Sequence, residues 1–144
     1  MKKKKVFIKG AITPAFITEK IAKHHIKHSI GAHNIFLGQV RADQINGKKV
    51  TAINYSCYEE MAEKKLHEIR ENAFAKYTLS CMHIYHSIGI VKAGEIGFVV
   101  FVSAKRRKEV FEATEYIVNQ VKEKVPIFGK EILEDYTHQW KINH

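Results

Sequence analysis

The sequence predicts an α+β domain with a mainly antiparallel sheet and three helices. Two long segments, residues 58–73 and 107–125, place apolar side chains at three- and four-residue steps, which is the period of an amphipathic helix. Shorter runs of alternating or continuous apolar residues surround them and are typical of strands. The 144 residues are 45% hydrophobic and 27% charged, so we expect residues 1–144 to form one globular domain.

Each expected element follows from a local pattern. Residues 50–57 alternate apolar with polar side chains, and Asn46-Gly47 before them is a strong signal for a hairpin turn. Residues 96–102 are almost continuously apolar, which predicts a central strand. Pro126 ends the last helix, because a residue that precedes proline is disfavoured in the helical region. The other expected elements are strands over 6–8, 30–40 and 79–90, an imperfect helix over 16–28, extended segments over 127–142 with a turn near 134–137, a turn at Gly94, and bulges or close approaches at Gly31 and Gly38.

The net charge of +9 favours an anionic partner, which includes nucleic acid, a membrane surface, a phosphorylated small molecule and an acidic protein. Residues 2–5 are four lysines that read most simply as a solvated tail. Only three apolar residues follow them, far short of a signal peptide, and no apolar run approaches the ~20 residues that cross a bilayer. We therefore expect a cytoplasmic protein. Cys57 and Cys81 form no CxxC pair and are expected to be small buried side chains.

Three basic clusters stand at the ends of expected elements: Arg41, residues 105–108 (Lys-Arg-Arg-Lys), and Lys122 with Lys124 and Lys130. A helix N-terminus already favours an anion, and arginine grips phosphate with two parallel N–H groups. Four cations at such a terminus are unfavourable unless an anion is bound. The pattern therefore predicts an anion site near Arg106, Arg107 and Lys122; the alternative is a frayed, solvated helix start.

Lys122 borders the apolar stripe of its helix, one turn after Val118. Partial desolvation at such an edge would lower the pKa of the lysine and make it a proton donor or nucleophile near neutral pH. Alternatively, the stem covers apolar surface while the ammonium group stays in water. The local pattern leaves both interpretations open.

The nine histidines raise the question of a metal site. His24 and His28 are four residues apart on an expected helix, which would make them a usable ligand pair. His83 and His86 are three apart on an expected strand and point to opposite faces. Neither a cysteine nor a carboxylate completes a set at a recognisable spacing, so the sequence predicts no metal site.

Five segments together resemble the sequence motifs of one known family. Residues 36–41 (FLGQVR) are similar to its F-x-G-x-V-R strand end, and residues 58–64 (YEEMAEK) to its Y-x-x-M-A-E-K helix start. Residues 86–89 (HSIG) resemble its H-R-I-G turn. Residues 103–113 (SAKRRKEVFEA) and 122–131 (KEKVPIFGKE) resemble S-S-P-H-R-x-x-A-F-E-A and K-x-x-V-P-I-W-K-K-E. The order and spacing agree over residues 30–140, and the family that these segments resemble is the large subunit of molybdopterin synthase.

The resemblance implies a fold of the α/β hammerhead type and a sulfurtransferase. Its substrate would be cyclic pyranopterin monophosphate, and no cofactor would be needed. The sulfur donor would be a small ubiquitin-like subunit whose C-terminal Gly-Gly carries a thiocarboxylate. Two large subunits would form the homodimeric centre of a heterotetramer, without nucleic acid or membrane. Two sulfur transfers would then make the dithiolene of the molybdenum cofactor.

The resemblance also implies which residues form the site. Lys122 matches the family's essential lysine, and Lys130 matches a second lysine with an expected catalytic role. Phe36 is expected at the pocket floor, and the bound phosphate should meet arginines, including arginines from the second copy. The implied substrate-binding residues are Phe36, Gln39, Val40, Arg41, Arg106, Arg107, Lys122, Gly129, Lys130 and Glu131.

Two positions depart from the family pattern. Arg106 stands where the family has histidine, so that group can bind an anion but not transfer a proton. Gly129 stands where the family has the first lysine of W-K-K-E, and Phe128 replaces the tryptophan. We expect Gly129 to let the chain bend so that Lys130 or Lys124 supplies the missing charge. The alternative function is a non-catalytic basic adaptor or nucleic-acid-binding module.

Overall fold

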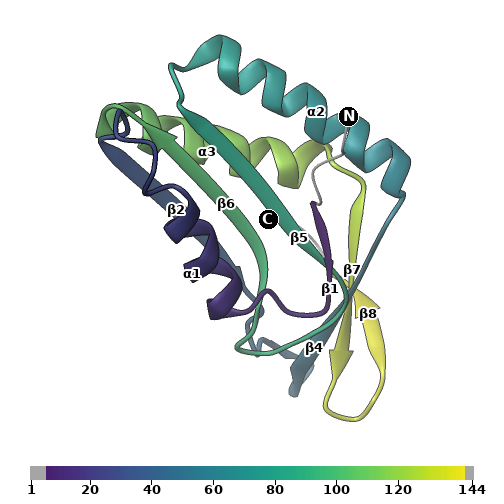
Figure 1. Cartoon of the computed structure of the whole chain (residues 1–144). Helices are drawn as coiled ribbons and strands as arrows, with labels where there is room; N and C mark the ends of the chain where they lie inside the picture. Colours follow the sequence, from purple (N-terminus) through teal and green to yellow (C-terminus); the bar gives the residue numbers. More distant parts are fainter. Residues whose placement is uncertain (1–5, 142–144) are drawn as a thin grey trace.

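The chain alternates strands with three helices over residues 6–141, the part that this computed structural model describes (Figure 1). The lysine run at residues 2–5 lies outside the described residues. No helix within the described part is long and apolar enough to cross a membrane. In chain order the elements are β1 (Phe7–Lys9), α1 (Pro14–Lys23), β2 (Ala32–Gln39), β3 (Gln44–Ile45), β4 (Lys48–Cys57), α2 (Glu59–Lys76), β5 (Cys81–Lys92), β6 (Ile96–Ala104), α3 (Arg107–Lys124), β7 (Ile127–Leu133) and β8 (His138–Trp140).

Within residues 6–141 the strands form one sheet in the order β2-β6-β5-β4-β7-β8, with β1 beside β5 and β3 beside β4. Every pairing is antiparallel except that of β1 with β5. One edge of β5 pairs with two different strands along its length. It pairs with β1 over His86, Ser87 and Ile88, and with β4 from Gly89 onward. Residues 86–89 are therefore part of a strand and not a turn, and Gly89 has a positive φ of 89° where the partner changes.

Helices α2 and α3 cover one face of the sheet, and α1 lies on the other (Figure 1). The core beneath α2 and α3 takes alternate residues of β5 and β6, among them Met82, Val100 and Val102. The opposite residues Tyr85 and Val99 pack with Ile12 on the α1 side. Strand β6 lies between two other strands and is buried on both faces, so the predicted interior position of residues 96–102 is confirmed.

Helix α1 differs most from its expected range. It begins at Pro14, where the Thr13 hydroxyl accepts a hydrogen bond from the Phe16 amide at 3.2 Å, and it ends at Lys23 rather than near residue 28. Residues 25–29 are all exposed, so a continued helix would bury nothing there. His24 and His28 are consequently not on one helix, so the expectation that a helix spaces this pair four residues apart is wrong.

A hairpin turn and a close approach of two backbone segments confirm the roles expected for Gly47 and Gly31. Asn46 and Gly47 both have positive φ, as a two-residue hairpin turn between β3 and β4 requires. At Gly31 a Cβ atom would lie 2.1 Å from the carbonyl oxygen of Lys105, so only glycine fits. This contact fixes the start of β2 against the end of β6, and the register of these two strands shifts at Gly38 near their other end.

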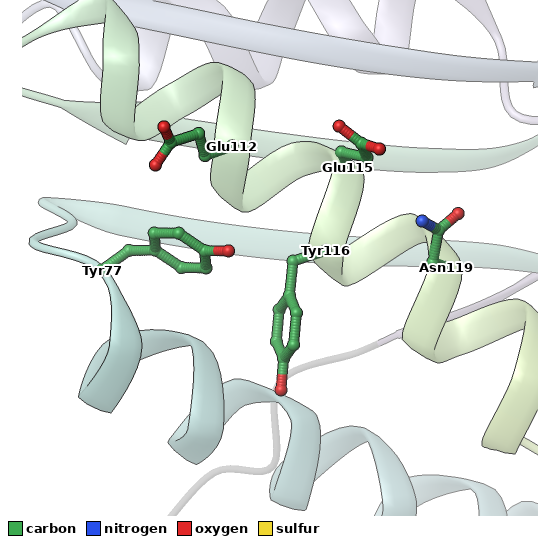
Figure 2. A pocket seen from close by; sticks show the side chains of 5 residues that line it. All are labelled: Tyr77, Glu112, Glu115, Tyr116 and Asn119. Carbon is green, nitrogen blue, oxygen red and sulfur yellow. The ribbon is translucent and has the colours of Figure 1, made fainter.

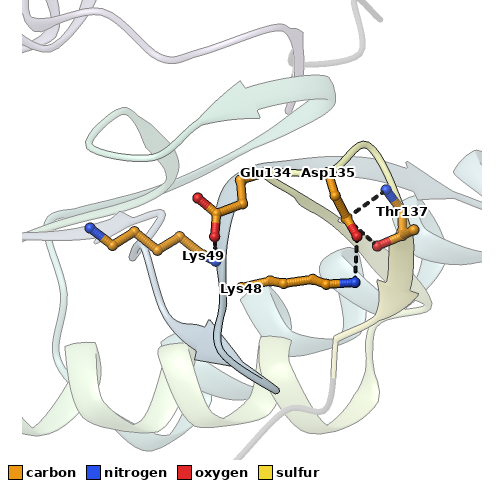
Figure 3. A network of polar contacts seen from close by, with 5 residues as sticks. All are labelled: Lys48, Lys49, Glu134, Asp135 and Thr137. Atoms are coloured by element: carbon orange, nitrogen blue, oxygen red, sulfur yellow. Dashed lines mark hydrogen bonds and ion pairs between the residues drawn. The ribbon is translucent and has the colours of Figure 1, made fainter.

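A polar network fixes the hairpin of β7 and β8 to the start of β4 (Figure 3). Lys48 forms an ion pair with Asp135, and the Lys49 amide donates to Glu134 at 3.1 Å. The Thr137 amide and hydroxyl both donate to Asp135, at 3.1 and 2.5 Å. Hydrogen bonds from Lys48 and then Thr137 hold the pKa of Asp135 well below its ordinary value. The turn expected near residues 134–137 is confirmed, and the network positions the chain that follows β8.

Candidate anion-binding site

One cavity of about 340 Å³ opens where the end of β2, the strands β4 to β7 and the last turn of α3 meet. Its walls combine apolar and aromatic side chains with three cations, and it contains no acidic side chain within the described part of the chain. A pocket of this size and lining suits a small anionic molecule. The lining residues are Gly38, Gln39, Val40, Arg41, Ile53, Tyr55, His86, Phe98, Val121, Lys122, Val125, Ile127, Gly129 and Lys141.

Lys122 enters this cavity from the last turn of α3, beside the buried residues Val121 and Val125. Desolvation, followed by the charges of Lys141 and Arg41, lowers the pKa of Lys122. The side chain as a whole stays exposed, so the structure keeps features of both interpretations: a stem that covers apolar surface and an ammonium group that is partly withdrawn from water. An ammonium group in this position can bind an anion, and it releases its proton more readily than an ordinary lysine.

Arg41 follows β2, whose end is held by backbone hydrogen bonds at Val40. The Val40 amide donates to the Glu95 carbonyl at 3.0 Å, and the Gly94 amide donates to the Val40 carbonyl at 2.8 Å. These bonds anchor the backbone next to Arg41, while the guanidinium stays largely exposed and meets Asp43 at 3.4 Å. Such an exposed ion pair contributes little to stability, so the arginine remains available to a ligand.

His86 forms part of the cavity wall and does not add a positive charge to it. Its ring packs edge-on against Tyr55, with ring centroids 4.9 Å apart, and beside Phe98. Nδ1 lies 2.8 Å from the Ser87 carbonyl oxygen, which can only accept, so Nδ1 carries the proton and Nε2 is free to accept one. Burial, and then the charge of Lys122, lower the pKa of His86 to about 4. The imidazole is therefore neutral at physiological pH.

Gly129 and Lys141 face each other across the β7–β8 pair. The Lys141 amide donates to the Gly129 carbonyl at 2.7 Å, and both residues line the cavity. A Cβ atom at Gly129 would lie 3.0 Å from Ile53 and 3.3 Å from Tyr55, so a side chain there would crowd the wall. The cation that the sequence lacks at residue 129 thus enters from the adjacent strand position, at Lys141.

The expected bend at Gly129 is wrong, because β7 keeps regular pairing with β4 through residues 128, 129 and 130. Successive side chains of a strand point to opposite faces, which turns Lys130 away from the cavity. Its ammonium group lies over the Trp140 ring, 5.4 Å from the centroid. Lys124 does not line the cavity either. Glu131 returns to the face of Gly129, where it is buried and contributes, after desolvation, to the raised pKa of Tyr55.

Arg106 and Arg107 lie at the opposite end of α3 from Lys122. Lys122 lies fifteen helical steps after Arg107, a rise of about 22 Å at 1.5 Å per residue. The predicted single anion site with Arg106, Arg107 and Lys122 is therefore not formed within one copy of the chain. All four side chains of residues 105–108 are exposed, and the N-cap makes no side-chain hydrogen bond. A role for these two arginines stays a prediction that needs a second copy.

The remaining predicted site residues divide between the wall and its support. Gln39 and Val40 line the cavity, as expected from their place beside Arg41. Phe36 lies one layer behind the wall, where its ring packs against Phe98 at a centroid distance of 5.7 Å. The aromatic residues Tyr55 and Phe98, and Lys141, were missed from the sequence. They come from β4, from β6 and from the residue that follows β8, and only the strand order brings them together.

Another depression, beside the end of α2 and the middle of α3, has the opposite charge (Figure 2). It is lined by Tyr77, Glu112, Glu115, Tyr116 and Asn119, and it is more open to solvent. Two carboxylates and no lining cation make it unsuitable for an anion. The cavity at Lys122 is therefore the candidate site. Neither Cys57 nor Cys81 lines it, and burial followed by Glu59 and Glu63 raises the pKa of the Cys57 thiol, which disfavours the nucleophilic thiolate.

Fold and cavity together define the class of protein: an α+β domain with a cationic cavity, suited to a small anionic molecule, around a lysine at the end of a helix. The chain belongs to the MoaE protein family, whose sequence model matches residues 12–124. It is 40% identical over 107 residues to the molybdopterin synthase catalytic subunit of Pyrococcus abyssi, covering 74% of this chain and 72% of that protein.

Solved structures agree with this family. The X-ray structure of molybdopterin synthase from Staphylococcus aureus is 32% identical, covers 99% of this chain and 100% of that one, and superposes with a TM-score of 0.84. A complex of subunits 1 and 2 of the molybdopterin-converting factor from Helicobacter pylori shares the fold, with a TM-score of 0.80 at 19% identity over 96% of this chain and 90% of that one.

Proposed function

We propose that this chain is the catalytic subunit of a molybdopterin synthase. It would transfer sulfur from the C-terminal thiocarboxylate of a small ubiquitin-like subunit to cyclic pyranopterin monophosphate and so form the molybdopterin dithiolene. The single observation that carries this proposal is the cavity in which Lys122, Arg41 and Lys141 meet against aromatic walls. Membership of the MoaE family supports the same reaction.

The cavity suits both charged participants of this reaction. Arg41 and Lys141 would hold the phosphate of the pterin, and each charge-assisted hydrogen bond would contribute roughly 1.5–3 kcal/mol. Tyr55 and Phe98 offer flat apolar surfaces to the pterin ring. The ammonium group of Lys122 would bind the thiocarboxylate and stabilise the negative charge that develops as the sulfur attacks carbon. Neutral His86 would leave this arrangement of charges unchanged.

The proposal includes two kinds of protein partner. The small subunit would thread its Gly-Gly tail into the cavity. Pairing with a second kind of subunit is supported by the complex of subunits 1 and 2 that shares this fold. A second copy of this chain would bring its own Arg106 and Arg107 to the cavity, because these arginines are too far from Lys122 within one copy. The reaction would use no resident cofactor. The cytoplasm is the proposed compartment, because both cysteines are free thiols, as expected in a reducing environment.

An in-vitro conversion assay tests the proposal. The chain would be mixed with the thiocarboxylated small subunit and cyclic pyranopterin monophosphate, and molybdopterin would be detected as its oxidised fluorescent derivative. We expect product from the wild-type chain and a loss of roughly 10²–10³-fold in kcat for Lys122→Ala, the effect of removing one group that stabilises developing charge.

Lys124→Ala is the matched control, because this lysine lies in the same helical turn and outside the cavity. Its kcat should stay within about twofold of the wild type, as expected for a solvent-exposed substitution. A wild-type chain that binds the small subunit but makes no product would contradict the proposed activity. Equal losses for both variants would contradict the role of Lys122.

A further inference from the structure

A second cluster of chemically active side chains lies on the α1 face of the sheet, away from the cavity. His24, Cys81 and His83 each offer one donor atom, and these three atoms all lie within 4.8 Å of one another. Within residues 6–141 they are the one set of three such groups. His24 and Cys81 are buried, at 7% and 6% exposure, so bulk water does not separate the donors.

The distance between the two histidine nitrogens fits a small tetrahedral ion. The Nε2 atoms of His24 and His83 are 3.3 Å apart. Two imidazole nitrogens bound to zinc at about 2.0–2.1 Å in tetrahedral geometry are separated by about 3.3–3.4 Å. Cys81 and His83 are two apart on β5, so they point to the same face, and β5 presents both to His24. Two imidazoles and a thiol are a donor set that zinc prefers.

The orientation of His24 is fixed by a bond on its far side. Its Nδ1 lies 2.7 Å from the carbonyl oxygen of Lys20, which can only accept, so Nδ1 carries the proton. Nε2 therefore turns its lone pair toward His83 and Cys81. The His24 ring also stacks on Phe101, with ring centroids 4.6 Å apart. A hydrogen bond on the remote nitrogen is the arrangement that orients metal-binding histidines.

The cluster also lies at the end of α1, a helix that is held to the sheet by few buried contacts. Helix α1 has no buried residue of its own, and His24 directly follows it. We propose that His24, Cys81 and His83 bind one zinc ion that clamps the end of α1 to β5. Three protein ligands leave the fourth position to solvent, and binding releases the proton of the Cys81 thiol. This inference is independent of the proposed catalysis, because the cavity residue His86 points to the opposite face of β5.

The cluster escaped sequence analysis because its members are far apart in the chain. Residues 24 and 81 belong to different elements, and the strand order that joins them is not visible in the spacing. The spacing instead suggested His24 with His28, which the end of α1 at Lys23 separates. It correctly indicated that His83 and His86 cannot share an ion.

Metal binding by the full chain tests the inference. The purified protein would be freed of metal with a chelator, titrated with zinc against a chromophoric competitor, and examined by absorption spectroscopy with cobalt(II). We expect one zinc per chain, and a cobalt complex with the strong visible bands of a tetrahedral site and a sulfur-to-cobalt charge-transfer band. Zinc should also raise Tm, because it binds only the folded cluster.

Substitutions locate the site. Cys81→Ser should lose the charge-transfer band, whereas Cys57→Ser, at the other cysteine, should keep it. His24→Gln and His83→Gln should weaken zinc binding by more than the roughly 10–100-fold that follows when only the hydrogen-bond partner of a ligand is removed. His28→Gln, at an exposed histidine nearby, should bind zinc as the wild type does. Circular dichroism of each metal-free variant shows whether it is folded.

The wild-type spectrum tests the idea even if a variant fails to fold. A wild-type cobalt complex without a thiolate band would overturn the proposal. Zinc affinity that is equal in the wild type and in folded His83→Gln would overturn it as well. In either case the contact between His24 and His83 is a hydrogen bond between two imidazoles and nothing more.

Discussion

Helix α3 carries basic side chains at both ends, and the surroundings of the two ends differ. At its N-terminus the side chains of residues 105–108 are all exposed, and the helix dipole disfavours cations there. At its C-terminus the dipole favours Lys122, and strands β2, β4 and β7 contribute residues around it. The pKa of Lys122 is lowered there by desolvation. The comparison teaches that walls contributed by other elements, more than the number of charges, make a basic cluster into a binding site.

Among the tests of this comparison, the largest effect is expected where the N-terminal end of α3 in one copy meets the C-terminal end of α3 in a second copy. If a second copy supplies its arginine to the Lys122 cavity, Arg107→Ala should lower kcat/KM roughly 10–150-fold, which corresponds to 1.5–3 kcal/mol. Mixing Arg107→Ala with Lys122→Ala chains, after subunit exchange, should restore about a quarter of the wild-type activity. In a two-fold symmetric dimer about half of the dimers are then mixed, and each has one intact site.

The conversion assay measures this restoration. Its control is a mixture of Lys124→Ala with Lys122→Ala chains, which should give about half of the wild-type activity because half of the sites keep Lys122 whichever way copies pair. A mixture of Arg107→Ala and Lys122→Ala with no more activity than its components would show that Arg107 does not reach the partner's cavity.

The second largest effect is expected at Lys141, the cation that lines the cavity beside Gly129. Lys141→Ala should raise the KM for cyclic pyranopterin monophosphate about tenfold, because it removes one charge-assisted contact from the cavity. Lys141→Arg keeps the charge and should recover most of this loss. Lys130→Ala, on the opposite face of β7, should change KM less than about twofold. Steady-state kinetics at fixed small-subunit concentration measure these KM values. If Lys130 were the functional residue, Lys130→Ala would raise KM more than Lys141→Ala does.

The smallest effect is a shift in pH dependence. The pKa of Lys122 is lowered by desolvation and by the charges of Lys141 and Arg41, so its ammonium form is lost at a lower pH than for an ordinary lysine. Lys141→Ala removes one of these charges, which should raise the pKa of Lys122 and move the alkaline limb of the kcat profile to higher pH. Lys130→Ala should leave the limb in place. A shift to lower pH in Lys141→Ala would contradict the arrangement of charges described above.

Most of the elements could be predicted from local patterns, because burial imposes a period on the chain. Helices α2 and α3 and strands β4 to β6 begin or end within a few residues of the expected positions. The end of α1 was misjudged because residues 25–29 contain Ile26, an apolar side chain that stays 80% exposed. Strand order could not be derived, because pairings such as that of β4 with β7 join segments about 75 residues apart, which no local pattern encodes.

In the site, too, residues marked by local patterns could be predicted, and residues placed by strand pairing could not. Lys122 and Arg41 stand at element ends that the sequence marks, and the family resemblance pointed to both. The separation of Arg107 from Lys122 also follows from the length of the predicted helix, a consequence that the single-site interpretation overlooked. No local sequence pattern around Lys141 predicted that this residue would line the cavity. Its position depends on the β7–β8 hairpin and on the missing side chain at Gly129.

The pairing of Gly129 with Lys141 has a consequence for how such proteins are compared. A residue-by-residue alignment assigns each position one column, and in the column of Gly129 this chain has no lysine. In space, the positive charge of Lys141 lies opposite Gly129, to which it is joined by a backbone hydrogen bond, twelve positions along the chain. A rule that sorts active from inactive relatives by that column alone would discard this chain. A rule that asks which charges reach the cavity would keep it.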